Sequence, residues 1–380
     1  MKQRLLWSYL VATAHALSSV PTWDALESRL RSAVCPEPPV YDISDADNIP
    51  SNQLVFYRDR NAECPFCERV WLALEIKGID YITVLHDEEL KVTWPDGTTQ
   101  HDSLDIIERL DKEYPGEPDL YPRVSQSVGG VRANIVRFKG VFPRNTDSRR
   151  ETPFLYRSGQ VVPRSDHMVT LEETDELLEE YDDGPFFCGE TITAADIAWA
   201  PFLERYAIQL PILYEDLKPR SRDYPELMKW YDSMERLVPC YLCRVKGDAV
   251  MWSKSLGNEK ITTDIPTDVN EKGFDAKDLW NAYRKGKPYL ARTPSEECAA
   301  RIVRNRNTIL SVLDPNEENN AALREICAAL VGSEASLSGN ARDVADFLAN
   351  KWLSVPRDMG VLPAAALRSL VAVAPKPRIR

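Results

Sequence analysis

Two cysteines separated by a proline and a phenylalanine constrain this chain more than any other feature. The motif Cys64-Pro65-Phe66-Cys67 follows a short apolar run, 54–57, and precedes an amphipathic stretch. The apolar run predicts a strand and the amphipathic stretch predicts a helix. Proline favours the first helical position because it lacks an N–H. The sequence therefore predicts that Cys64 stands at the start of a helix that follows a buried strand.

Further short elements follow this helix in a fixed order. The apolar run 81–85 indicates a second strand parallel to the first, and the runs on either side of Pro95-Asp96-Gly97 indicate a hairpin. Apolar residues three and four apart over 104–110 then indicate a second helix. The order β-α-β-β-β-α is that of an α/β thioredoxin-like domain from which the usual second helix is missing.

Cys64 is the candidate nucleophile, because amide N–H groups and the helix dipole at a helix start stabilise a thiolate. Cys67 lies one turn further along, where it could resolve a mixed disulfide or pack beneath the helix start; the sequence leaves both interpretations open. The pair could also form a zinc site with Cys240 and Cys243. A proline between two thiols on a strand-to-helix turn is instead typical of redox chemistry, so no metal is predicted.

Residues 64–70, with the sequence Cys-Pro-Phe-Cys-Glu-Arg-Val, resemble the cysteine-type classes of the soluble glutathione transferase superfamily: omega, lambda and the dehydroascorbate reductases. The resemblance implies a thioredoxin-like N-terminal domain and an all-α glutathione transferase C-terminal domain. It also implies glutathione as co-substrate and Cys64 as the catalytic nucleophile. Cys67 is the second candidate catalytic residue, although the family's usual residue at that position is not a thiol. Pro65 and Phe66 would then contribute to substrate binding.

A second motif, Asp102-Ser103, follows the predicted hairpin and precedes the second helix. It matches the acidic-Ser pair that holds the γ-glutamyl end of glutathione in this family. An acid would pair with the α-amino group of the ligand, while the hydroxyl and the helix start would hold its carboxylate. The alternative interpretation of Asp102 is a plain helix cap.

The second half of the chain carries a third motif. An amphipathic helix over 171–181 is followed by 184–197, which strongly resembles the all-helical domain of the family. Within it, Thr193 and Asp196 have the spacing of a capping box, which serves folding rather than catalysis. This motif is therefore a marker of the fold.

One segment departs from the family pattern. Ten residues separate Leu85 from Asp96, where the family carries a helix, a loop and a cis-proline before the hairpin. The cis-proline would fall near Leu90 or Lys91, and neither is proline. A cis peptide bond before a residue other than proline costs about 3 kcal/mol. In the family that peptide pairs with the cysteinyl part of glutathione. Weaker glutathione binding is expected, whether the loss is natural or reflects a defective gene model.

Length and the resemblance together predict the domain organisation. At about 150 residues per domain, 380 residues make two or three domains. The resemblance assigns 52–120 to the glutathione-binding domain and about 125–255 to the helical domain. Residues 256–290 are expected to be a linker, and 291–380 a helical extension that could receive a protein partner.

The N-terminus has the pattern of a targeting segment. Lys2 and Arg4 precede an apolar run in 1–17, which predicts a signal peptide, and 18–51 is expected to be a presequence or linker. These features favour a plastid-like organelle or the endomembrane lumen. The alternative is an amphipathic first helix in a cytoplasmic protein.

Charge and composition exclude several function classes. There are 47 basic and 59 acidic residues, a formal net charge of −12, and no basic patch, so a nucleic-acid partner is not expected. Eight cysteines are too few for a disulfide-stapled scaffold and are expected to be free thiols. No glycine-rich nucleotide fingerprint is present.

The sequence thus favours a glutathione-dependent thiol transferase or reductase that acts on a small oxidised or electrophilic acceptor, in a chain that could form a homodimer. The alternative is a noncatalytic scaffold or interaction protein with the same fold. Retention of Cys64 favours the enzyme, whereas loss of the cis-proline segment favours the scaffold.

Overall fold

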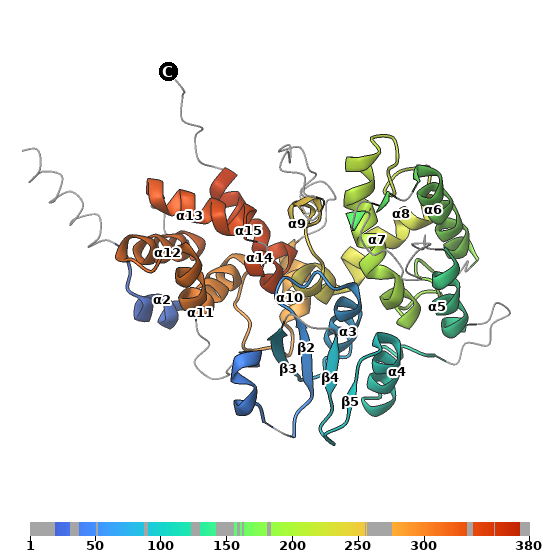
Figure 1. Cartoon of the computed structure of the whole chain (residues 1–380), viewed down its shortest axis with the longest axis horizontal. Helices are drawn as coiled ribbons and strands as arrows, with labels where there is room; N and C mark the ends of the chain where they lie inside the picture. Colours follow the sequence, from blue (N-terminus) through green and yellow to red (C-terminus); the bar gives the residue numbers. More distant parts are fainter. Residues whose placement is uncertain are drawn as a thin grey trace, which may run out of the picture. The chain divides into compact units, whose positions relative to one another are not determined.

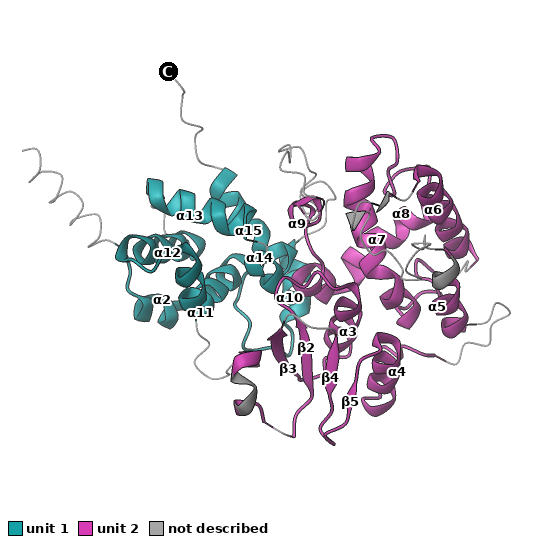
Figure 2. Cartoon of the chain, in the orientation of Figure 1, with its two compact units in different colours: residues 1–37, 275–380 teal, residues 38–274 magenta. Residues whose placement is uncertain are grey.

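The computed structural model describes residues 20–30, 38–50, 52–86, 90–122, 130–141, 156–157, 160–161, 163–180, 184–254, 256, 276–332, 337–352 and 354–372. The chain forms two compact units (Figures 1 and 2). One unit comprises residues 38–274, and the other comprises residues 1–37 together with 275–380. The predicted signal peptide lies outside the described residues.

The unit of residues 38–274 contains a mixed five-stranded sheet in the order β1-β3-β2-β4-β5. Its strands are β1 (Val40–Asp42), β2 (Val55–Asp59), β3 (Ile82–His86), β4 (Lys91–Thr93) and β5 (Thr99–Gln100). Strand β3 runs parallel to β1 and β2, β4 is antiparallel to β2, and β5 is antiparallel to β4. The parallel pair and the hairpin agree with the order predicted from the sequence.

Two helices accompany this sheet, α3 (Pro65–Ile76) and α4 (Ser103–Glu113), and they pack against each other (Figure 1). The guanidinium of Arg58 in β2 lies over the Trp71 ring of α3, 4.7 Å from its centroid. Because alternate strand residues point to opposite faces, α3 covers the face that carries Arg58 and Phe56. Helix α3 is bounded as predicted: Pro65 is its first residue, and Gly78, with φ +61°, follows its end.

The opposite face of the sheet is covered by the segment that precedes it. Strand β3 ends at His86 and β4 begins at Lys91, and no described helix stands between them. A buried cluster on this face is covered by one side chain of β1 and by one residue that follows the 3-10 helix η1 (Ile43–Asn48). The cluster consists of Val55, Tyr57, Ile82 and Val84, with Tyr41 and Ile49 packed against it.

A helical domain completes this unit. It comprises α5 (Gly130–Val141), α6 (Arg164–Glu179), α7 (Ala194–Leu213), α8 (Pro225–Leu237), the π-helix η2 (Tyr241–Val245) and α9 (Ala249–Lys254), besides the short strands β6 (Tyr156–Arg157) and β7 (Gln160–Val161). The predicted capping box begins α7: Thr193 N donates to Asp196 Oδ2 over 2.8 Å, and the Thr193 side chain accepts from Ala195 N. Helix α7 packs against α3, so the helical domain contacts the domain that contains the five-stranded sheet.

The other unit is entirely helical among its described residues. It contains α2 (Trp23–Leu30), α10 (Ala276–Arg284), α11 (Pro294–Leu313), α12 (Glu317–Leu330), α13 (Gly339–Asn350), α14 (Ser354–Met359) and α15 (Val361–Ala372). The predicted C-terminal helical region is thus present. Helices α2 and α10 fall in ranges expected to be presequence and linker, and Leu26 of α2 is fully buried in the core of this unit. Among all described helices, none combines the length and apolar composition needed to cross a membrane.

Candidate functional site

The thiol of Cys64 stands at the N-terminus of α3. Cys64 is the N-cap residue, with extended backbone angles, and its Sγ accepts a hydrogen bond from Cys67 N over 3.4 Å. This amide is one of those that a helix start leaves without an intrahelical acceptor. Cys64 is half-buried, whereas the other free cysteines of the described chain are buried. The structure therefore places one partly accessible sulfur at the predicted helix start.

The two thiols of the motif have opposite electrostatic environments. Hydrogen bonds from the Cys67 side chain, and from the amides of Cys67 and Phe66, lower the pKa of Cys64 below its ordinary value against burial and the charge of Asp59. The hydrogen bond to Cys64, followed by burial, raises the pKa of Cys67 well above its ordinary value. Of the two thiols, Cys64 therefore ionises more readily. Cys67 stays protonated and donates a hydrogen bond to the Cys64 sulfur.

Asp59, at the end of β2, holds the backbone ahead of the nucleophile. Its Oδ2 accepts from Glu63 N over 2.6 Å, and its Oδ1 accepts from Cys64 N over 3.3 Å. Between them, buried Ala62 adopts φ +49°, a left-handed conformation that is unfavourable for a residue with a side chain. The sequence analysis did not identify Asp59; an acidic residue between a strand and a helix-start cysteine is the signal that points to it.

The second predicted motif lies at the same edge of the sheet. Because β5 runs parallel to β2, the helices that follow these strands, α4 and α3, both begin at one edge. Arg69 of α3 ties them together: its Nη1 donates to Ser103 Oγ over 3.5 Å, and its Nε donates to Ala198 O over 2.9 Å. The structure thus brings Cys64 and Ser103 to one end of the helix pair.

Asp102 acts as a helix cap, the alternative that the sequence left open. Its Oδ1 accepts from Leu104 N over 2.9 Å and from Asp105 N over 3.1 Å. The side chain of Asp102 is exposed, whereas Ser103 is buried. A cap carboxylate at a surface helix start keeps its second oxygen accessible, so capping and ligand binding are compatible roles.

Pro65 and Phe66 differ in accessibility. Pro65 is buried as the first residue of α3, while Phe66 is 37% exposed beside Cys64. The Phe66 ring meets that of Phe202 edge-on, with centroids 6.3 Å apart, and the Arg69 guanidinium lies 5.4 Å from its centroid. Phe66 therefore offers an aromatic surface next to the thiol, held in place from two sides.

Leu90 is one of the two residues near which the sequence analysis places the cis-proline of the family pattern; the other is Lys91. The carbonyl oxygen of Leu90 is 3.1 Å from Nδ1 of His101, the residue that precedes Asp102. The one cis peptide bond among the described residues lies elsewhere, between Glu117 and Pro118. The backbone at Leu90 is thus engaged by a side chain of this chain itself.

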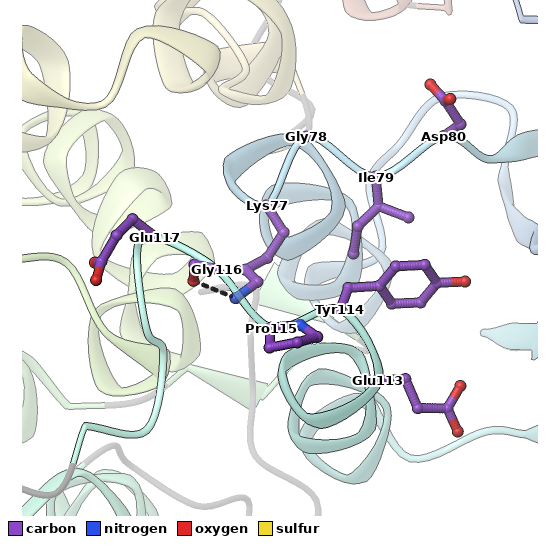
Figure 3. Close-up of a pocket in the computed structure, with 9 residues that line it drawn as sticks. All are labelled: Lys77, Gly78, Ile79, Asp80, Glu113, Tyr114, Pro115, Gly116 and Glu117. Atoms are coloured by element: carbon purple, nitrogen blue, oxygen red, sulfur yellow. Dashed lines mark hydrogen bonds between the residues drawn. The ribbon is translucent and has the colours of Figure 1, made fainter.

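A cavity of about 530 Å³ lies at the other ends of α3 and α4 (Figure 3). Its walls are formed by Lys77, Gly78, Ile79, Asp80, Glu113, Tyr114, Pro115, Gly116 and Glu117. Lys77 Nζ donates to Asp111 Oδ1 over 2.8 Å, to Gly116 O over 2.9 Å and to Pro118 O over 3.1 Å. The 12-residue length of α3, about 18 Å, separates this cavity from Cys64.

In the described part of the chain, no three His, Cys, Asp or Glu residues gather as candidate metal ligands. Cys240 and Cys243, the residues that could have completed a zinc site with the first pair, are both buried at the π-helix η2.

A thioredoxin-like sheet with a cysteine at a helix start, joined to a helical domain, defines the architecture of a glutathione transferase. Residues 62–118 match the glutathione S-transferase N-terminal domain, and residues 160–233 match the glutathione S-transferase C-terminal domain. Two regions of the chain therefore carry the domain pattern of the glutathione S-transferase family.

Individual relatives each cover less than half of the chain. Glutathione S-transferase L1 of Arabidopsis thaliana is 27% identical over 194 residues, which are 46% of this chain and 76% of the relative. Glutathione S-transferase DHAR3, chloroplastic, of the same plant is 31% identical over 164 residues, or 39% of this chain and 57% of the relative. Among solved structures, dehydroascorbate reductase from Chlamydomonas reinhardtii has a TM-score of 0.35 at 19% identity, covering 49% of this chain and 90% of that chain.

Proposed function

We propose that the protein is a glutathione-dependent thiol transferase or reductase with Cys64 as its nucleophile. The observation that carries the proposal is the position of Cys64: half-buried, at the N-cap of α3, with its pKa lowered by hydrogen bonds from Cys67 and Phe66. A thiolate at a helix start is the reactive form for sulfur exchange. The matches of residues 62–118 and 160–233 to the two glutathione S-transferase domains support glutathione as the co-substrate.

The reaction proceeds by two sulfur exchanges. The Cys64 thiolate attacks the glutathionyl sulfur of a mixed disulfide, so a bond from Cys64 to glutathione forms and the acceptor leaves as a thiolate that takes up a proton. A second glutathione, as thiolate, then attacks the glutathionyl sulfur on Cys64. Glutathione disulfide is released and the Cys64 thiolate is regenerated, with glutathione as the two-electron reductant. Reduction of a small oxidised or electrophilic acceptor of the dehydroascorbate type would use the same nucleophile.

The edge that carries Cys64 would also bind glutathione. Asp102 is placed to pair with the α-amino group of the ligand, and Ser103 with the start of α4 is placed to hold its carboxylate. Pro65 fixes the helix start, and the exposed ring of Phe66 would contact the bound ligand or acceptor. These assignments follow the placement of both motifs at one edge of the sheet.

The scaffold function is a second candidate, and one observation favours it. The carbonyl of Leu90, near which the family pattern has its cis-proline clamp, contacts His101. A chain without that clamp retains fewer groups to hold glutathione. In this interpretation the helical region within 291–380 receives a protein partner.

We extend three further expectations as part of the proposal. The domain limits are 52–120 for glutathione binding and about 125–255 for the helical domain, and the chain forms a homodimer. Location in a plastid is supported by the relatives described as chloroplastic.

Thiol reactivity tests the enzymatic proposal directly. After brief exposure to iodoacetamide at pH 7, mass spectrometry should find Cys64 labelled first. Burial raises the pKa of Cys188 to about 11 and the pKa values of Cys298 and Cys327 also above the ordinary value. Preferential labelling of any of these three would remove the catalytic assignment. Turnover of a glutathionylated peptide with glutathione, measured on the same sample, separates an enzyme from a scaffold.

A further inference from the structure

Arg205 of α7 connects the helical domain to the backbone that carries Cys64. Its Nη2 donates to Glu63 O over 3.1 Å, and its Nη1 lies 3.0 Å from Glu68 Oε2. The side chains of Arg205 and Glu68 are 0% and 1% exposed. The guanidinium therefore contacts the residue immediately before the nucleophile and a residue in the first turn after it.

The peptide ahead of Cys64 is held on both sides. Glu63 N donates to Asp59 Oδ2, from β2, while Glu63 O accepts from Arg205, from α7. The amide of Cys64 itself donates to Asp59. One carboxylate and one guanidinium, from different domains of the same unit, thus fix the chain direction as it enters α3.

The guanidinium is itself fixed by its surroundings. It lies 3.9 Å from the centroid of the Trp252 ring, and Trp252 Nε1 donates to Glu204 Oε1 over 2.6 Å. A side chain at Gly247 would come within 2.7 Å of the same indole, so glycine is needed there. A planar guanidinium can serve two acceptors in fixed directions while stacking on an aromatic ring, which a lysine ammonium cannot do.

We infer that Arg205 is a positioning residue that holds the Glu63 peptide so that Cys64 Sγ stays against the amide of Cys67. The inference rests on the proposed function of Cys64. Arg205 acts through the backbone, because its Nη2 donates to Glu63 O, while its other contacts include Glu68, the Pro201 carbonyl and the Trp252 ring. Arg205 and Glu68 form an oppositely charged buried pair, so the proposed effect of Arg205 on the thiolate is one of geometry.

The test is the pH dependence of Cys64 alkylation in the double variant Arg205→Met with Glu68→Gln. Removing both charges avoids the unpaired buried ion that a single substitution would leave. If Arg205 positions the sulfur, the alkylation midpoint rises by about one pH unit, and the rate at pH 7 falls roughly tenfold. A folded double variant with the wild-type midpoint would overturn the inference.

The variant Arg205→Lys distinguishes a role in positioning the Cys64 sulfur from a role in stabilising the fold. It also tests the inference if the double variant does not fold. Lysine keeps the charge opposite Glu68, so the melting temperature should return to that of the wild-type protein. The alkylation midpoint of Cys64 should stay raised, because one ammonium cannot reproduce the planar donor geometry of the guanidinium. A wild-type midpoint in Arg205→Lys would overturn the inference.

The matched control is the buried pair Glu297 and Arg301 in the other unit, with Oε1 and Nε 2.6 Å apart and side chains 4% and 2% exposed. Glu297→Gln with Arg301→Met should lower the melting temperature without moving the Cys64 midpoint. An equal shift in this control would show that the midpoint follows general stability, which also overturns the inference. Failure of the proposed function looks different: Cys64 of the wild-type protein would then not be labelled preferentially.

Discussion

The two ends of the α3 and α4 pair carry different chemistry although the same helices build both. At the N-terminal ends, Cys64 accepts from a helix-start amide and Ser103 contacts Arg69. At the C-terminal ends lies a cavity of about 530 Å³, where three oxygen acceptors surround the ammonium of Lys77. A thiolate is stabilised at a helix N-terminus and destabilised at a C-terminus. Helix polarity, rather than the size of a cavity, therefore favours the N-terminal ends for the proposed sulfur chemistry.

The contrast between the two ends would be wrong if the protein kept its thiol-transfer activity without the Cys64 thiol. Cys64→Ser should reduce transfer from a glutathionylated peptide by more than about 10³-fold, because a serine hydroxyl is not ionised at neutral pH. The measurement is glutathione-dependent release of the peptide thiol, with the melting temperature as control for folding. Substantial residual turnover would place the reaction elsewhere.

The C-terminal end should matter for stability alone. The side chain of Lys77 is 2% exposed and pairs with Asp111, whose side chain is 13% exposed. Lys77→Met should lower the free energy of unfolding by about 2 kcal/mol, since this partly buried acid and two carbonyl oxygens lose their donor. Denaturant unfolding measures this loss. The alkylation midpoint of Cys64 should not move; a shift would show that the two ends are coupled through α3.

The segment before β4 offers a way to strengthen the N-terminal end. Inserting a family-like helix and loop ahead of Val92, with proline in place of Leu90 or Lys91, should restore two backbone hydrogen bonds to glutathione. At about 1 kcal/mol each, they would tighten binding roughly thirtyfold. Calorimetry on both chains measures the change, and the same insert with alanine instead of proline is the control. Tight binding by the unaltered chain, or no gain from the insert, would favour the scaffold.

Local signals were sufficient to predict much of this architecture. The capping box from Thr193 to Asp196 spans four residues, and the turn at Gly97, with φ +82°, closes a short hairpin. Helix α3 begins at Pro65 because proline and the N-cap cysteine are adjacent. Such features depend on neighbours in the chain, so the sequence predicts them and places Cys64 correctly at a helix start.

Contacts between distant residues could not be predicted in this way. Arg205 meets the carbonyl of Glu63 across 142 positions, and Trp23 Nε1 donates to Asn320 across 297. The sequence predicts a presequence or linker over 18–51, whereas α2 lies in this range and buries Leu26 in the core of its unit. Core contacts of this kind depend on residues far away in the chain.

Cys67 provides the smallest and most discriminating test of the N-terminal end. In the monothiol mechanism, Cys67→Ser should keep turnover within about twofold of wild type, because glutathione resolves the mixed disulfide and the serine hydroxyl still donates to Cys64. Cys67→Ala loses that donor, so the pKa of Cys64 should rise and its alkylation midpoint should move to higher pH. The shift is upward because the hydrogen bond from Cys67 is the main cause that lowers this pKa. Turnover of the alanine variant should recover above the new midpoint. If both variants instead lose turnover at every pH while Cys64 still alkylates, Cys67 is the resolving thiol and the mechanism is dithiol.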